Sequence, residues 1–471
     1  MGEMMTVSRR TKSLRALHRL SQTEENPEII IKNISRMLIV VILITWGFSF
    51  IGGYSNSVIV LNVLGLLLAI VGMRYPAIGV LGVGLLCTLD PLTRNLLLSG
   101  GLWRWNTLNY WLVIVILLNL RLLLRLNDPN SRWLMAFWGI MALMLPLSVY
   151  VSDGLQDLLN VGATLGILIY FVKASRNPQV YYWQGIVNGV VGVLGGLAFY
   201  LQLGNLPYIN PNSWAAFPMT ALFSIALALP SAKDIKYGRL ILLSLAAVNV
   251  IWVFLTGSRG SLLTAMVVVV CYLMILRSIS WTTLFLIAGS IAAFWAFNLL
   301  WEREAYALSR IQRLFDPTYT IAERTSGRSD IAATGLKIFQ ERPFGIGTGS
   351  FRAGAILLNI QGGAARPAHS GWIKTLAENG VQGILIMVFM VGSFLVVGWQ
   401  RRDKNCFAIG FLVTTVLAVS FVSKEFQGKD LWYLVAGAIP LLNPQHTENY
   451  LNEPIMRSSR RRVRSKEAGI K

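Results

Sequence analysis

Three arginines in this sequence stand where a phosphate group could be bound. Arg259, in "LTGSRGSLL", separates two apolar runs and has no acidic residue within ten positions, while Arg324 and Arg328 lie in "AERTSGRSD". A guanidinium donates paired hydrogen bonds to phosphate oxygens and stays charged at any relevant pH. Taken singly, Arg259 also fits an arginine at the membrane interface, and Arg324 and Arg328 fit solvated loop charges. Together they predict a site for a phosphate-bearing ligand.

His369 is the candidate general base. The other two histidines, His18 and His446, lie near the ends of the chain. The segment "PAHSGWIKTLAENG" reads as a helix opened by Pro367 and closed by Gly380. In such a helix, Trp372 and Ile373 share the face of His369, so we predict that the imidazole faces the bundle. A structural histidine is the alternative, but a desolvated imidazole also suits proton transfer.

The sequence lacks the usual signatures of metal and nucleotide chemistry. It has no Asp-x-Asp pair, no Walker lysine and no histidine or cysteine pair at zinc spacing. Cys87, Cys271 and Cys406 lie in or beside apolar runs and are interpreted as small core residues. We therefore predict no metal and no cofactor.

Two features of the composition indicate a membrane protein with several spans. The chain has 471 residues, of which 54% are hydrophobic and 14% charged, whereas soluble domains have about 25% charged residues. Its net charge of +20 would suggest nucleic acid in a soluble protein. Here the basic ends, "SRRTKSLR" and "RSSRRRVRSK", are better explained as tails beside anionic membrane lipids, so we expect no nucleic-acid partner.

Apolar runs of membrane-spanning length predict an all-α bundle of about twelve to fourteen transmembrane helices with one large external loop that contains short helices. We predict that the chain consists of a basic cytoplasmic tail (1–36), eleven transmembrane helices (37–300), a large external loop (301–370), the last transmembrane helices (371–442) and a second basic cytoplasmic tail (443–471). The predicted spans are 37–53, 57–73, 76–90, 107–124, 133–151, 156–172, 180–203, 213–230, 240–256, 261–277, 281–300, 380–398, 405–422 and 429–442.

The basic residues of alternate loops indicate the orientation. Loops with Arg74, with Arg121 and Arg125, and with Lys233 and Lys236 alternate with loops such as "VSDGLQD" that have neither Lys nor Arg. Because cytoplasmic loops carry the excess of Lys and Arg, we predict both termini in the cytoplasm. Arg259 and the loop 301–370 then lie on the external face.

Two further pieces of the external loop have a recognisable pattern. "SDIAATGLKIFQERP" predicts a short amphipathic helix that stops before Pro343. "FGIGTGSF" predicts a turn punctuated by glycines. The loop is therefore expected to fold.

These motifs resemble the O-antigen ligase and polymerase superfamily (the Wzy/WaaL type) over about 200–400. Arg259 and Leu263 match its Arg-x-x-x-Leu element, and Arg328 precedes a turn similar to its Pro-x-Gly-x-Gly element. His369 leads into "LAENG", which includes Glu378 and resembles the family's Leu-x-Ala-Glu-x-Gly element. The sequence has Ser370 after the histidine, where the family usually has Asn.

The resemblance implies a fold similar to the C-type membrane glycosyltransferases. It implies metal-independent, inverting transfer of a glycan from a polyprenyl-pyrophosphate carrier to an acceptor hydroxyl of a lipid A core, a glycan or a protein, in a bacterial inner membrane. In this interpretation Arg259, Arg324 and Arg328 bind pyrophosphate, His369 is the base, and Ser370 and Glu378 support it.

A membrane transporter for an anion such as bicarbonate is the alternative. Transporter sites usually lie near the middle of the membrane, on broken helices from repeated halves. This sequence has no internal repeat, and its candidate residues gather at one face. The transferase is therefore the favoured hypothesis.

Overall fold

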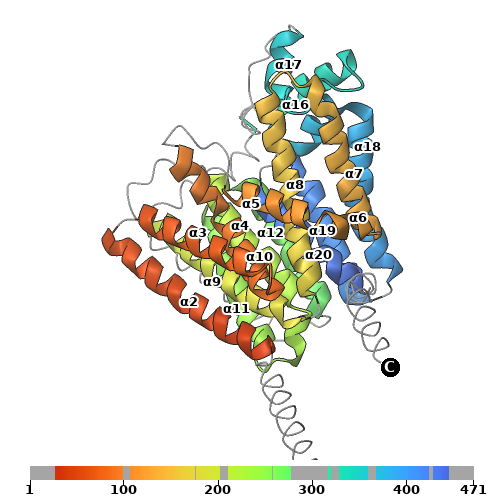
Figure 1. Cartoon of the computed structure of the whole chain (residues 1–471). Helices are drawn as coiled ribbons and strands as arrows, with labels where there is room; N and C mark the ends of the chain where they lie inside the picture. The colour runs from red at the N-terminus through yellow and green to blue at the C-terminus, as the bar shows by residue number, and fades with distance from the viewer. Residues whose placement is uncertain are drawn as a thin grey trace, which may run out of the picture.

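A computed structural model describes residues 27–52, 54–98, 107–175, 177–201, 211–256, 258–276, 317–318, 320, 328–358, 368–401, 403–423 and 428–444. The regular elements of these residues are all helices (Figure 1). The helices are α2 (Pro27–Gly52), α3 (Tyr54–Val71), α4 (Pro76–Leu98), α5 (Thr107–Leu118), α6 (Leu120–Arg125), α7 (Pro129–Met144), η1 (Leu145–Leu147), α8 (Val151–Ala174), α9 (Gln179–Leu201), α10 (Pro211–Ala228), η2 (Ser231–Asp234), α11 (Gly238–Leu255), α12 (Arg259–Leu276), α16 (Arg328–Glu341), α17 (Phe351–Leu357), α18 (Gly371–Gln400), α19 (Lys404–Ser423) and α20 (Lys429–Leu442).

Most of the described residues in the predicted spans are helical, although residues 148–150, in the predicted span 133–151, are not. Among the described residues, four helices are both long and apolar enough to cross a membrane: α8, α11, α18 and α19. The predicted span 281–300 lies outside the described residues. These helices confirm an all-α membrane protein.

Some boundaries differ from the prediction. Helix α2 begins at Pro27 and not at residue 37, because proline fits the first position of a helix, where its missing N–H is not needed. The predicted span 107–124 is divided at Asn119 into α5 and α6. The predicted tails, 1–36 and 443–471, lie mostly outside the described residues, and residues 27–36 belong to α2.

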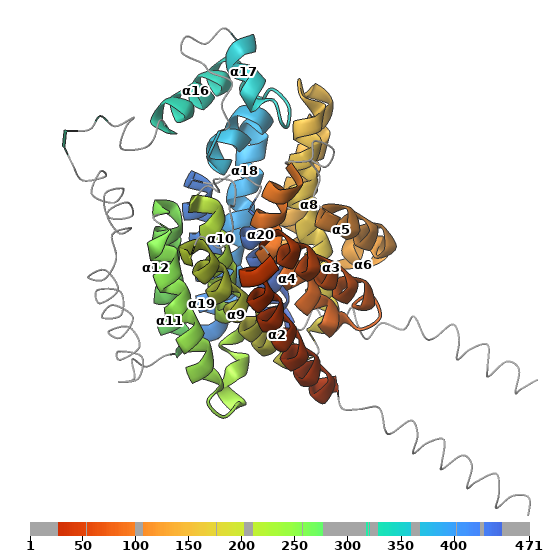
Figure 2. The same ribbon diagram turned by 90° about the vertical axis from the view of Figure 1, so that its left-hand side faces the viewer.

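The helices share two ends, which we call the upper and lower ends as drawn in Figure 1. At the upper end, α7 and α19 end and α8, α12 and α18 begin, and α16 and α17 cover this end (Figures 1 and 2). At the lower end, Asn443 Nδ2, just after α20, lies 3.4 Å from Oδ1 of Asp128, the cap of α7. Arg401, at the end of α18, also contacts Asn443.

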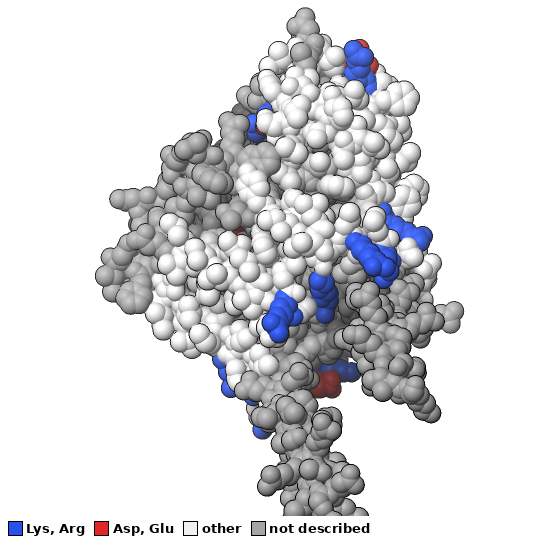
Figure 3. All heavy atoms as spheres, viewed as in Figure 1, with Lys and Arg blue, Asp and Glu red and all other residues white. Residues whose placement is uncertain are grey.

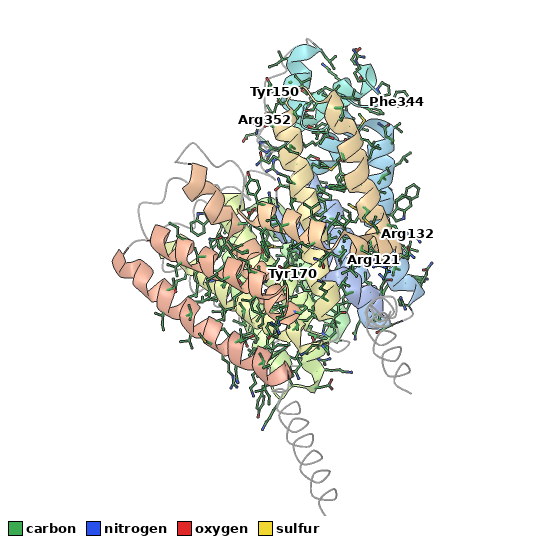
Figure 4. All side chains as sticks on the ribbon, viewed as in Figure 1. Arg121, Arg132, Tyr150, Tyr170, Phe344 and Arg352 are labelled. Carbon is green, nitrogen blue, oxygen red and sulfur yellow. The ribbon has the colours of Figure 1, made fainter. Side chains whose placement is uncertain are left out.

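Small residues let the central helices approach closely. Gly185 of α9 lies against Ala228 of α10, and Gly192 of α9 lies against Asn249 of α11, so a side chain at either glycine would collide with the neighbour. Close backbone approach at small residues is typical of helix pairs in membranes. Tyr170 lies in the middle of the bundle (Figure 4) and donates a hydrogen bond to Ala69 O at 2.7 Å.

The outer surface has the character of a lipid-facing protein. Large apolar side chains are exposed on several helices, for example Leu124 of α6 and Leu143 of α7. Figure 3 shows a broad uncharged face on which the Lys and Arg side chains form small groups. Figure 4 places Arg121 and Arg132 near α6 and the start of α7, while Arg352 lies at the upper end.

Candidate functional site

The candidate site is built around a kinked helix. Helix α18 runs from Gly371 to Gln400, but Gly380 has φ 65° and ψ −161° and interrupts the helical backbone. We call Gly371–Asn379 the hub segment and Val381–Gln400 the span segment. The predicted stop at Gly380 is therefore confirmed as a kink, although hydrogen bonding continues beyond it.

Ser370, rather than Pro367, marks the start of this helix. Its side chain accepts a hydrogen bond from Ile373 N at 3.4 Å, as the cap of a helix does. The same hydroxyl donates to Phe421 O at 2.9 Å, which ties the hub segment to the end of α19. These contacts of Ser370 are with backbone groups, and its predicted support of His369 stays a prediction.

His369 precedes the helix, and the prediction that it faces the bundle is wrong. Its side chain is exposed, because a residue before the cap does not follow the periodicity of the helix. Its φ of 53° lies in the left-handed region, which is uncommon for residues other than glycine. The backbone is held there by buried Ala368 on one side and by Ser370 on the other. Such a strained, over-determined backbone is frequent at functional sites.

Hydrogen bonds bring Arg259 and His369 to the same end of the molecule. Arg259 is the first residue of α12; its side chain lies outside the described residues. Five residues later, Thr264 Oγ1 lies 3.3 Å from Ser420 Oγ near the end of α19. The next residue of α19, Phe421, accepts the bond from Ser370. The end of α19 therefore links the two predicted residues.

Arg328 begins α16, and its side chain is partly buried. Helix α16 packs on the hub segment through a small apolar core that includes Ile331, Ile338 and Ala377. Figure 2 shows α16 and α17 above the upper ends of α10 and α12. The structure thus places Arg328 at the same end as Arg259 and His369, while Arg324 lies outside the described residues.

The glycine turn is confirmed, and it acts as a clasp. Gly345, Gly347 and Gly349 all have positive φ, which glycine adopts without steric cost. The turn donates from Gly347 N to Glu378 O at 2.9 Å and accepts at Pro343 O from Val381 N at 2.9 Å. It therefore pairs with backbone groups exposed by the kink of α18.

The clasp also reaches the other helices of the upper end. Thr348 Oγ1 donates to Met141 O in α7 at 2.8 Å and lies 2.9 Å from the side-chain amide of Asn379. Ser350 Oγ accepts from Val149 N, just before α8, at 2.9 Å. The clasp consequently joins α7, α8 and α18.

Glu378 has a structural position. Its side chain is fully buried, and Oε1 accepts a hydrogen bond from Phe351 N at the start of α17 at 2.9 Å. This buried carboxyl group is bonded to a backbone N–H, and its predicted support of His369 stays a prediction. It does not suit the role of a base that meets substrate at the surface.

Sequence reasoning missed a group of buried charges beside the hub segment. Lys374 Nζ lies 2.6 Å from Asp157 Oδ2 of α8, and both side chains are buried. Three residues along α8, Asn160 Oδ1 accepts from Lys429 Nζ of α20 at 2.9 Å. The available signal was the presence of Asp157, Lys374 and Lys429 within or beside apolar runs, since ionisable side chains at membrane depth are rare and functional.

Metal independence stays a prediction. In the part of the chain that the structure describes, no three His, Cys, Asp or Glu side chains are grouped as metal ligands would be. Chelation is the direct test.

Residues 240–388 match the family model described as O-antigen ligase (Wzy_C). The matched region extends from α11 into α18 and includes Arg259, Arg324, Arg328 and His369. No curated protein matches the chain. The region that carries the predicted site residues is therefore similar to the O-antigen ligase family, as the motifs predict.

Proposed function

We propose that this protein transfers a glycan from a polyprenyl-pyrophosphate carrier to an acceptor hydroxyl at the outer face of a bacterial inner membrane. The observation that carries the proposal is the family match over 240–388, which includes Arg259, Arg328 and His369. The link from α12 through the end of α19 to Ser370 supports it further. The acceptor is a lipid A core, a growing glycan or a protein hydroxyl.

The chemistry follows from the residue types. His369 takes the proton of the acceptor hydroxyl as its oxygen forms a bond to the anomeric carbon. The bond from that carbon to the pyrophosphate breaks on the opposite face, so the configuration inverts and polyprenyl pyrophosphate leaves. Arg259 and Arg328, with Arg324, stabilise the charge that develops on the leaving group.

The distribution of basic residues supports the orientation. Arg121 lies on α6 and Arg132 near the start of α7, toward the lower end, and Arg401 ends α18 there. Because Lys and Arg are enriched on the cytoplasmic side, the lower end faces the cytoplasm, together with both termini. The upper end, with His369, faces outward.

Reconstitution tests the proposal directly. Purified protein in liposomes, supplied with a lipid-linked glycan and an acceptor, should release the polyprenyl pyrophosphate and lengthen or glycosylate the acceptor. Deletion of the gene followed by electrophoresis of surface glycans then separates two roles. Loss of a ligase leaves full-length chains on the carrier, and loss of a polymerase leaves single repeat units.

One observation favours the alternative of an anion transporter. Lys374 and Lys429 are buried among helices, and buried ionisable residues in membrane proteins often mark the path of an ion. The two functions give opposite results in liposomes. Saturable uptake of labelled bicarbonate without glycan transfer would support the transporter and contradict the transferase.

A further inference from the structure

The hub segment is a short helix between two points where the backbone leaves the helical conformation. His369 has φ 53° at one end, and Gly380 has φ 65° at the other. We propose that the buried ion pair between Lys374 and Asp157 positions the hub segment, and through it His369. This inference rests on the proposed function, in which His369 is the catalytic base.

The ion pair is close to His369 along the chain, and both of its side chains are buried. Lys374 N donates to Ser370 O at 3.0 Å, so Lys374 lies one helical turn from the residue that follows His369. Its Nζ is 2.6 Å from Asp157 Oδ2, with side-chain exposures of 8% and 3%. An ion pair screened from water resists separation far more than a surface pair does.

The remaining bonds at the start of the hub segment go to one neighbour. Ser370 Oγ donates to Phe421 O, and Trp372 Nε1 donates to Ala418 O at 3.0 Å, both on α19. At its other end, the hub segment is bonded to the glycine turn through Ala377 O and Glu378 O. Between these two ends, the Lys374–Asp157 ion pair is the attachment of the hub segment to α8, in its first half and close to His369.

A second buried contact on α8 provides the matched control. Asn160 lies three residues after Asp157, on the same side of the helix. It accepts from Lys429 of α20 at 2.9 Å and from Asn109 of α5 at 3.2 Å. Neither of these bonds involves α18, so a change at Asn160 tests the general effect of altering the buried polar group.

The test replaces both charges together. Removal of Lys374 alone leaves an uncompensated buried carboxylate, which destabilises a protein, whereas a paired apolar replacement is often tolerated. In reconstituted full-length protein, Lys374→Met combined with Asp157→Leu should lower kcat by about tenfold to a hundredfold, since small displacements of catalytic groups have effects of this size. The KM for the lipid-linked donor should change less than about twofold, because this contact does not touch the donor.

The decisive comparison uses a His369→Ala background. If the pair acts through His369, the double replacement should lower kcat by less than about twofold in that background, because the group that it positions is gone. An equal loss in both backgrounds, or no loss with His369 present, would overturn the inference. The Asn160→Ala control should keep kcat within about threefold. If His369→Ala alone is fully active, the proposed function fails instead.

A distance measurement gives a second readout that needs no activity. Spin labels are attached at Leu147→Cys, next to α8, and at His369→Cys. The distance between them reports the position of the hub segment relative to α8, with exposed Leu147 as the fixed point. Cys406 is replaced by Ser beforehand. Pulsed electron paramagnetic resonance should show a broader or shifted distance distribution in the paired replacement than with the pair intact. An unchanged distribution would contradict the inference.

Discussion

The hub segment and the span segment belong to one helix, yet they are held in different ways. The hub segment is fixed by directional contacts: an ion pair with Asp157, side-chain bonds to α19 and backbone bonds to the glycine turn. The span segment is fixed mainly by apolar side chains, with Phe394 fully buried, while Leu385 is exposed. Directional bonds define the position of a group, whereas apolar packing mainly holds helices together. The difference predicts that changes in the two halves affect different quantities.

The largest effect is expected at the start of the hub segment. His369→Ala should lower kcat by about a hundredfold to ten-thousandfold, the usual contribution of a general base, with donor binding and thermal stability almost unchanged. The activity of the natural protein should rise with pH as histidine loses its proton, at about pH 6–7. The variant should lack this rise.

Loss of donor binding in His369→Ala, with the pH dependence retained, would contradict the role of a base. His369→Asn is the matched control for the backbone, because asparagine tolerates positive φ better than alanine does. It should be as inactive as the alanine variant.

The next effect tests whether the upper end holds an anion. Arg259→Ala should lower turnover by about a hundredfold to a thousandfold, the usual loss for one preorganised donor, with normal insertion into the membrane. Arg259→Lys should restore little, since an ammonium does not reproduce the paired hydrogen bonds of a guanidinium. Full activity of the lysine variant would reduce the role of Arg259 to charge alone.

The kink connects the two halves of α18, and its loss should disturb both. At Gly380 an added side chain would collide with the backbone of Pro343 and Phe344, and the positive φ is itself strained for alanine. Gly380→Ala should therefore destabilise the protein by about 1–3 kcal/mol from the backbone alone and lower kcat through displacement of the hub segment. Gly392, where a side chain meets no atom within 4 Å, is the control.

The span segment should affect stability alone. Phe394→Ala removes a fully buried side chain and should destabilise the protein by about 3–5 kcal/mol, while the kcat of the folded fraction stays within about threefold. Leu385→Ala, at an exposed position, should change neither quantity. A large change in kcat for folded Phe394→Ala would show that the two halves are not independent.

The smallest effect is expected from chelation. Because arginines are proposed to take the place of a metal at the pyrophosphate, transfer by purified protein should persist in excess EDTA. Abolition by EDTA and recovery with magnesium would contradict this assignment. Asp330, in the first turn of α16, would then be the first ligand to test.

The sequence was sufficient for an all-α membrane protein, because a helix that crosses a membrane requires an apolar run of a given length. It was also sufficient for α16, whose apolar periodicity ends before Pro343, and for the glycine turn. The orientation of His369 was wrong because Ser370, not Pro367, caps the helix. Because both Pro367 and Ser370 can begin a helix, the sequence alone does not identify which of them does so.

The Lys374–Asp157 pair could not be predicted for a different reason. The two residues are far apart in the sequence, and an apolar run with one charge does not indicate which other charge lies beside it. Only the packing of α18 beside α8 makes them neighbours. The same holds for Thr348, whose contacts with Met141 and Asn379 depend on three separate parts of the chain.

The clasp made by the glycine turn has a consequence for biogenesis. Thr348 bonds to Met141, which is synthesised long before it, and contacts Asn379, which is synthesised after it. Because the ribosome makes the chain from the N-terminus onward, the clasp closes only when the first part of α18 has emerged. The upper end is therefore among the last parts of the protein to mature, and a chain truncated before α18 would insert most of its helices without an assembled site.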